Sequence, residues 1–258
     1  MLIAFDIGNT NVLVGEIDDD GSILRQTRIE TSKILVDKSN AQLQLLSLIK
    51  KLSIISDNTA IIASVVPQVL KIIVIMLESK SINFNIIKST DTIIGMKVEL
   101  DKPEELGADR IVNSFAAFNE YKTSLIVIDF GTATTFDIID SIGVYKGGLI
   151  CPGIKLSIKS LNIETAQLPL IELKRVSKII GTSTKSAIES GIYWGYVSLV
   201  EGLISKIKIE MEIPDCIVVG TGGLSHIFKE DIKEINYFND DLTLKGLYQI
   251  NRKINDQK

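Results

Sequence analysis

Two apolar segments of this chain each end at an aspartate that is followed by a glycine-containing turn. The first turn has the sequence Asp-Ile-Gly-Asn-Thr-Asn over residues 6–11, and the second has Asp-Phe-Gly-Thr-Ala-Thr-Thr over residues 129–135. One glycine-rich turn after a strand is a weak signal, but two copies at matching points indicate a duplicated fold. We therefore expect two halves of similar construction.

The segments around the two turns also match. In the first half, strand-like stretches cover residues 2–5, 12–17 and 22–29, and in the second half they cover residues 125–128, 135–139 and 144–148. Each half is thus predicted to open with a three-strand meander. Later strands alternate with helices, which we expect at residues 67–78 and 184–210, so the predicted class is α/β with mixed sheets flanked by helices. We place the domains at residues 1–120 and 121–258.

The residue types of the two turns favour a phosphate site. Glycine lets the backbone approach a phosphate closely, while asparagine and threonine side chains add hydrogen-bond donors. A carboxylate repels phosphate oxygens, so the aspartate is interpreted as a ligand for a cation that accompanies the phosphates. An ordinary hairpin uses the same residue types, but the matching pair of turns favours the phosphate site.

A third motif, Gly107-Ala108-Asp109-Arg110, precedes a stretch with helical apolar periodicity. Asp109 and Arg110 are therefore expected in the first turn of a helix. An aspartate there can simply complement the helix dipole. Alternatively, its carboxylate can accept the proton of an attacking hydroxyl while the neighbouring guanidinium binds an anionic group of the same substrate.

Composition excludes several classes of function. With 28 basic and 32 acidic residues the net charge is -4, which argues against nucleic-acid binding. No segment has the length of uninterrupted apolar sequence that a membrane span needs. The two cysteines, Cys151 and Cys216, have no metal-binding or paired spacing, and they fit a reducing cytoplasm.

Taken together, these motifs resemble those of the type III pantothenate kinases, in order and spacing, from the start of the chain to about Gly223. The motifs are residues 6–11, 107–110 and 129–135, the Gly147-Gly148 and Pro152-Gly153 pairs, and residues 181–184. The resemblance implies duplicated ribonuclease H-like domains of the actin-like ATPase type, with the active site in the cleft between them. It also implies ATP-dependent phosphorylation of pantothenate, the first step of coenzyme A biosynthesis, by a homodimer. From the composition we expect this protein to be cytoplasmic and to bind neither nucleic acid nor membrane.

The resemblance further implies a role for each motif residue. Asp109 would be the general base. ATP would be bound by Asp6, Ile7, Gly8, Asn9, Thr10, Asn11, Val12, Leu13 and Thr132. Pantothenate would be bound by Leu100, Gly107, Ala108, Asp109, Arg110 and Thr184. Asp6 would hold Mg²⁺ through water, Asp129 would hold a monovalent cation (K⁺ or NH₄⁺), and Gly220 to Gly223 would lie on the adenosine side.

Some points stay open at this stage. Leu100 stands where the family usually has a tyrosine, which removes a hydroxyl and a ring face from the pantothenate pocket. Ala187, Gly191 and Gly195 form a small-residue stripe that serves either packing within the subunit or a homodimer contact. A kinase for another small hydroxyl compound and a non-enzymatic nucleotide-binding transcriptional regulator are the alternatives. The presence of both the base and the cation ligands argues against the regulator.

Overall fold

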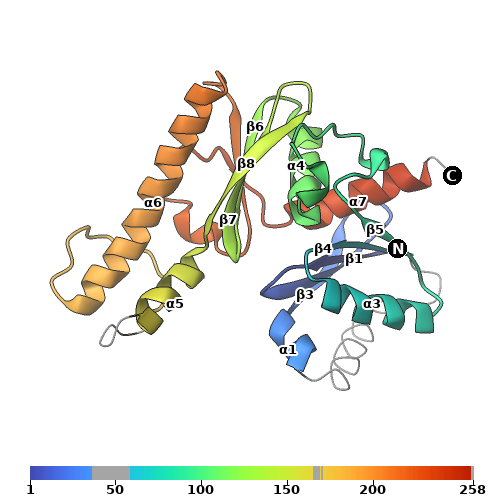
Figure 1. Ribbon diagram of the computed structural model, residues 1–258, viewed down its shortest axis with the longest axis horizontal. Helices are drawn as coiled ribbons and strands as arrows, with labels where there is room; N and C mark the ends of the chain where they lie inside the picture. The colour runs from blue at the N-terminus through green and yellow to red at the C-terminus, as the bar shows by residue number, and fades with distance from the viewer. Residues whose placement is uncertain (37–58, 165–168, 170, 257–258) are drawn as a thin grey trace. The chain divides into compact units, whose positions relative to one another are not determined.

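The computed structural model describes residues 1–36, 59–164, 169 and 171–256 (Figure 1). These residues form two compact units. One comprises Met1–Asn119 together with Asp241–Lys258, and the other comprises Glu120–Asp240.

The first unit is built on a mixed five-stranded sheet. Its strand order is β3 (Ile23–Glu30), β2 (Asn11–Ile17), β1 (Leu2–Ile7), β4 (Thr59–Ser64) and β5 (Asn83–Ile87). Strand β1 pairs antiparallel with β2 and parallel with β4. Among its described residues, the helices of this unit are α1 (Thr31–Val36), α3 (Pro67–Ser79), most of α4 (Ala108–Tyr121) and α7 (Leu242–Asn255), with short 3₁₀ turns at Thr92–Ile94 and Pro103–Glu105.

The second unit repeats this arrangement. Its strand order is β8 (Tyr145–Pro152), β7 (Ala133–Ile139), β6 (Leu125–Phe130), β9 (Ile217–Thr221) and β10 (Tyr237–Phe238). Strand β6 pairs antiparallel with β7 and parallel with β9, as β1 does with β2 and β4. Helices α5 (Ile154–Glu164) and α6 (Thr184–Glu210) and the 3₁₀ turn η3 (Ser225–Phe228) complete the unit. The predicted duplication and α/β class are confirmed.

Hydrophobic patterning explains which strands are central. Strands β1 and β6 are almost continuously apolar and buried, as expected for strands covered on both faces. The meander strands β3 and β8 consist mostly of half-buried and exposed positions, which alternate toward the end of each strand, as is typical of sheet edges. Each unit has its own buried apolar cluster, one around Phe5 and Val14 and the other around Phe136 and Tyr193.

The helix predictions hold as well. Helix α6 covers residues 184–210 as predicted, and it begins with a capping box between Ser183 and Ser186. Helix α3 begins at Pro67, which is suited to a first helical position, and ends one residue beyond the predicted end. Among the described residues, no helix is both long and apolar enough to cross a bilayer.

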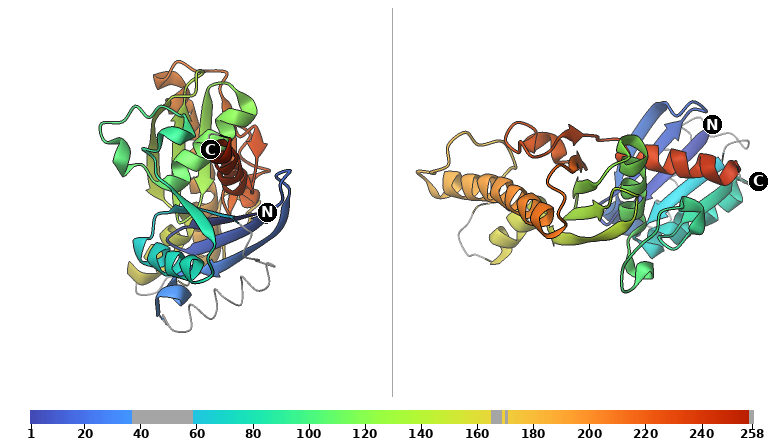
Figure 2. Two further views of the ribbon diagram at one scale, coloured as in Figure 1. Left: turned by 90° about the vertical axis from the view of Figure 1, so that its right-hand side faces the viewer. Right: turned by 90° about the horizontal axis from the view of Figure 1, so that it is seen from above.

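The last helix differs from the division made by sequence, which assigned residues 121–258 to the second half. Helix α7 packs in the first unit, alongside β1 and β4 (Figure 2). Its Thr243 hydroxyl donates to Asn113 Oδ1 at 2.7 Å, and Lys253 Nζ donates to the Ile94 carbonyl at 2.8 Å. An apolar face that includes Leu244, Leu247 and Ile250 is fully buried, so this helix is part of the core of the first unit.

We expect Gly246 to be required where α7 crosses α4. A Cβ added there would lie 2.6 Å from the Val112 carbonyl oxygen and 2.7 Å from Val112 Cγ1. Alanine gains about 1 kcal/mol in helix propensity, but overpacking costs about 1–3 kcal/mol. Gly246→Ala is therefore expected to lower the free energy of unfolding in urea, while Lys245→Ala on the exposed side leaves it nearly unchanged. Equal stability of the two variants would contradict the close helix crossing.

Candidate active site

The first turn follows directly from the central strand of the first unit. Asp6 is the penultimate residue of β1 and is half-buried, opposite Leu13 of β2 and Ala63 of β4. The Gly8 N–H donates to the Asn11 carbonyl at 3.0 Å and closes the turn. Asn9, Thr10 and Asn11 are exposed, whereas the side chains of Ile7, Val12 and Leu13 are buried. Of these last three residues, therefore, only the backbone can face a ligand.

A residue that the sequence did not single out anchors this turn. Thr31, at the start of α1, is buried, and its hydroxyl donates to the Gly8 carbonyl at 2.7 Å. Its backbone N–H donates to the Thr10 carbonyl at 2.8 Å. The turn is thus held from both ends by one threonine. No local pattern in the sequence connects position 31 with position 8.

Asp109 lies in the first turn of α4, as predicted. Its Oδ1 accepts a hydrogen bond from the backbone N–H of Arg110 at 2.8 Å. A Cβ added to Gly107 would lie only 2.5 Å from the same oxygen. Glycine at position 107 therefore lets the carboxylate fold back against the backbone that precedes the helix.

Burial raises the pKa of the Asp109 carboxyl above its ordinary value of 3.8. The hydrogen bond from Arg110 N–H and the positive charge of the Arg110 side chain act in the opposite direction, but more weakly. A carboxylate that is desolvated in this way is a stronger base than one in water. Asp109 and Arg110 are both half-buried, so part of each side chain is accessible to a ligand.

The Asp109 motif and the Asp6 turn lie at the same edge of the first sheet. Val65, which follows β4, donates its N–H to the Ile7 carbonyl at 3.0 Å. The same residue contacts the other motif, because its Cγ1 lies 3.5 Å from the position of a Cβ on Gly107. Val65 thus connects the two motifs. The first unit brings the Asp6 turn and the Asp109 carboxylate together at the carboxyl ends of its parallel strands, the usual place for ligands in α/β sheets.

The second turn occupies the equivalent place in the second unit. Asp129 is the penultimate residue of β6 and pairs with Thr135 of β7 and Thr221 of β9. The Gly131 N–H donates to the Ala133 carbonyl at 3.1 Å, so this turn is one residue shorter than the first. Gly222, with φ of +92°, lies beside it, and a Cβ there would be 2.2 Å from Asp129 Oδ1. The sequence did not predict that Gly222 contacts this aspartate.

The loop between β8 and α5 supports the second turn. A Cβ on Gly153 would lie 2.0 Å from the Thr132 carbonyl oxygen and 2.8 Å from the Gly131 carbonyl oxygen. The Pro152-Gly153 pair that the sequence singled out therefore packs directly under the turn. Thr132 itself is exposed, so a ligand can reach its side chain.

The remaining predicted pantothenate residues are spread over both units. Leu100 is half-buried and Ala108 is buried, both in the first unit. Thr184 is exposed at the first position of α6 in the second unit, where it lines a groove of about 610 Å³ with Leu161 and Ala187.

The two aspartates have surroundings that suit hard cations, which prefer oxygen ligands. A side chain at Gly222 would fill the space next to the Asp129 carboxylate, and the turn at Asp6 is rich in backbone, amide and hydroxyl groups. Within the described ranges, no group of three or more His, Cys, Asp or Glu side chains could hold a metal. A Mg²⁺ ion is commonly held in proteins by one or two carboxylates together with water and the phosphates of a ligand.

Solved structures share this fold at low sequence identity. The activator of 2-hydroxyisocaproyl-CoA dehydratase from Clostridium difficile, solved with bound ADPNP, matches with a TM-score of 0.54 over 99% of this chain and 96% of that one, at 15% identity. The ethanolamine utilization protein EutJ from Carboxydothermus hydrogenoformans matches with a TM-score of 0.58 over 96% and 89%, at 12% identity. Together with the sheet topology, these matches establish a duplicated fold of the actin-like ATPase type.

Sequence comparison identifies the family, whereas the structure matches identify only the fold. The family model for type III pantothenate kinase matches residues 2–206. A type III pantothenate kinase of Paramagnetospirillum magneticum is 43% identical, with 98% of this chain and 97% of the relative covered. One from Rhodospirillum rubrum is 40% identical, with 98% of each covered. The chain belongs to the type III pantothenate kinase family.

Proposed function

We propose that this chain transfers the terminal phosphoryl group of ATP to the primary hydroxyl of pantothenate, with Asp109 as the general base. The products are ADP and 4'-phosphopantothenate, and the reaction is the first step of coenzyme A biosynthesis. Family membership supports the reaction. The observation that carries the assignment of the base is the half-buried Asp109 carboxylate with a raised pKa, held against Gly107.

In this mechanism the Asp109 carboxylate accepts the hydroxyl proton as the substrate oxygen forms its bond to phosphorus and the bond to ADP breaks. Phosphoryl transfer needs little covalent help from the protein, so positioning and charge neutralisation supply most of the acceleration. Asp109 is suited to this role because its Oδ1 is fixed by the Arg110 N–H. The other carboxylate oxygen is then available to the substrate.

Arg110 and its neighbours would bind the rest of pantothenate. The guanidinium of Arg110 would bind the carboxylate of pantothenate, since arginine can donate two parallel hydrogen bonds to a carboxylate. The other contacts we assign to pantothenate are Leu100, Gly107, Ala108 and Thr184. Leu100 supplies apolar contact without the hydroxyl of the usual tyrosine.

The two turns would share the binding of ATP and its cations. Residues 6–13 face the phosphates through backbone groups and through the exposed side chains of Asn9, Thr10 and Asn11. Thr132 contacts ATP from the second turn. Asp6 would hold Mg²⁺ through water, and Asp129 would hold K⁺ or NH₄⁺. These cations supply positive charge that offsets the charge of the phosphates during transfer.

A change of Asp109 to Asn tests the base. General-base catalysis typically contributes about 10² to 10⁴ in rate, so Asp109→Asn is expected to lower kcat by about 100-fold or more. Binding of an ATP analogue should stay within about twofold of wild type, because the first turn is untouched. The control is Glu104→Gln, which neutralises an exposed carboxylate nearby.

The pH dependence and stability of the same variants complete this test. Because the pKa of Asp109 is raised, the carboxylate forms only above that pKa, so wild-type kcat should fall as pH is lowered through it. Asp109→Asn should lack this acid limb. It should also melt no lower than wild type at pH 7, since a charge that burial disfavours has been removed. Turnover within a few-fold of wild type would contradict the assignment of the base.

We also propose that the chain is a homodimer, and that the exposed face of α6 forms the contact. Gly191 and Gly195 are exposed, and within the described part of the chain a Cβ on either would meet nothing within 4 Å. Packing inside the subunit therefore does not explain glycines that cost about 1 kcal/mol each in a helix. The adjoining groove is lined by apolar side chains, including Leu161, Ile188 and Ile192, which a second copy would cover.

An arginine on this face should break the dimer. Gly195→Arg puts a large, charged side chain at a position of α6 that now has none, and the partner helix could no longer approach closely. The variant is therefore expected to be a monomer, and wild type a dimer, in light scattering coupled to size-exclusion chromatography. Gln68→Arg adds the same charge to an exposed position of α3 and should leave the mass unchanged. A monomeric wild type, or a Gly195→Arg protein that stays dimeric, would contradict the assignment.

A cytoplasmic location stays a prediction. Cys151 and Cys216 are both free thiols, which suits a reducing compartment. The substrates of the family, ATP and pantothenate, are consistent with the same compartment.

A further inference from the structure

A tyrosine of α6 connects this helix to the segment under the second turn. Tyr196 is almost fully buried, and its hydroxyl donates to the Pro152 carbonyl at the end of β8. The Thr134 hydroxyl, which is also buried, donates to the Tyr196 oxygen at 3.5 Å. One phenol group thus holds β7 and β8 together at the end of the sheet where the Asp129 turn lies.

The held segment is in direct contact with the turn. Pro152 precedes Gly153, whose Cα approaches the Gly131 and Thr132 carbonyls so closely that a Cβ would overlap both. Thr134 is paired with Phe130 across the β6–β7 ladder, at the base of the turn. Any displacement of Pro152 or Thr134 would therefore be passed to the backbone of Gly131 and Thr132.

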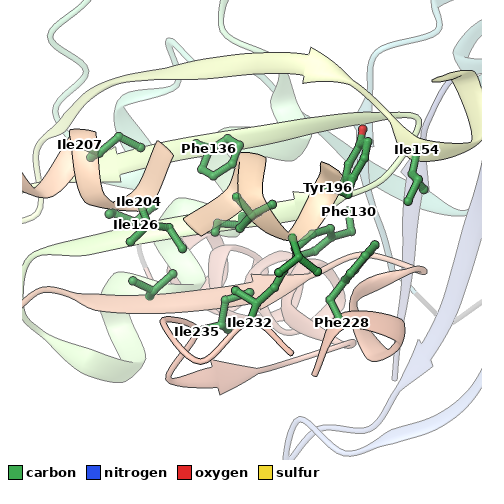
Figure 3. Close-up of a cluster of buried hydrophobic side chains, with 14 of the residues drawn as sticks. Ile126, Phe130, Phe136, Ile154, Tyr196, Ile204, Ile207, Phe228, Ile232 and Ile235 are labelled. Carbon is green, nitrogen blue, oxygen red and sulfur yellow. The ribbon is translucent and has the colours of Figure 1, made fainter. Parts of the chain in front are cut away.

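An aromatic cluster fixes the tyrosine ring itself. Phe228 stacks on Phe130 at a centroid distance of 5.2 Å and on Tyr196 at 6.1 Å. Figure 3 shows these three rings next to one another, with the Tyr196 hydroxyl directed away from Phe228. Phe130 directly follows Asp129 in the chain. The ring of Tyr196 therefore packs in the aromatic cluster, whereas its hydroxyl holds the segment under the turn.

We propose that Tyr196 is a positioning residue for nucleotide binding, and that its hydroxyl holds the Asp129 to Thr132 turn in the conformation that accepts ATP. The proposal rests on the proposed role of Asp129 and Thr132 in binding ATP and its cation. The hydroxyl acts through Pro152 and Gly153 and need not touch the nucleotide. Its loss should then weaken nucleotide binding more than it weakens the fold.

The test compares two tyrosine-to-phenylalanine changes on the same helix. Tyr193 stacks on the same Phe228 ring at 5.6 Å, but the acceptors of its hydroxyl are Asp231 Oδ2 at 2.5 Å and the Ile227 carbonyl at 3.3 Å, and neither belongs to the turn or to β8. Tyr196→Phe and Tyr193→Phe each keep the ring and remove one buried hydroxyl. Only the first removes the support of the turn.

Three measurements separate positioning from stability. Calorimetry gives the Kd of a non-hydrolysable ATP analogue with Mg²⁺, hydrogen exchange reports the backbone amides of residues 129–135, and steady-state kinetics gives KM for ATP and for pantothenate. Loss of one hydrogen bond that supports the binding site corresponds to about a 3- to 10-fold change in a dissociation constant. We expect Tyr196→Phe to raise the Kd and the KM for ATP by that factor and to speed exchange in the turn, with KM for pantothenate unchanged. Tyr193→Phe should lower only the melting temperature.

Equal effects of the two variants on analogue binding and on exchange in the turn would overturn the proposal. If Tyr196→Phe does not fold, Thr134→Val removes the link between Tyr196 and β7 and keeps the bond to Pro152, and a smaller increase of exchange in the turn is expected. If wild-type protein binds the analogue but does not phosphorylate pantothenate, the proposed function fails. Binding and exchange then still decide the role of Tyr196.

Discussion

The structure depends on placing a carboxylate near the end of a central strand whose other residues are buried. In each unit that strand has an antiparallel neighbour on one side and a parallel neighbour on the other, so its backbone is held from both sides. Asp6 and Asp129 occupy the penultimate position of these strands and are only half-buried. The charge can therefore reach solvent or a cation, which avoids the large cost of burying it unpaired.

Close approach of glycine backbones then shapes the surroundings of each carboxylate. Gly222 lies against Asp129, Gly107 lies against Asp109, and Gly153 lies under Thr132, and in each case a Cβ would overlap an oxygen atom. A small side chain at any of these positions would have to displace the functional group next to it. The need for close approach therefore explains why glycine occupies all three positions, which turn geometry alone does not.

Much of the fold and part of the site were predictable from the sequence, because they depend on local patterns. The meanders, helix α6 and the position of Asp109 follow from apolar periodicity and from the residues that begin helices. What could not be predicted depends on contacts between residues distant in the chain. Thr31, which holds the first turn, and Tyr196, which supports the second, belong to no local sequence motif that would mark them. Helix α7 packs in the first unit, where Gly246 permits a close crossing with α4.

The central claim is that the two copies of the turn bind different cations. The Asp6 turn would bind Mg²⁺ and the ATP phosphates, and Asp129 would bind a monovalent cation. The most direct measurement is the rate of phosphopantothenate formation as K⁺ is varied at saturating Mg²⁺ and ATP, for wild type, Asp129→Asn and Asp6→Asn. The account predicts that Asp129→Asn raises the K⁺ concentration for half-maximal rate by about tenfold or more, as loss of a charged ligand should. Asp6→Asn should change the Mg²⁺ requirement instead. An unchanged K⁺ response in Asp129→Asn, or the same change in both variants, would contradict the account.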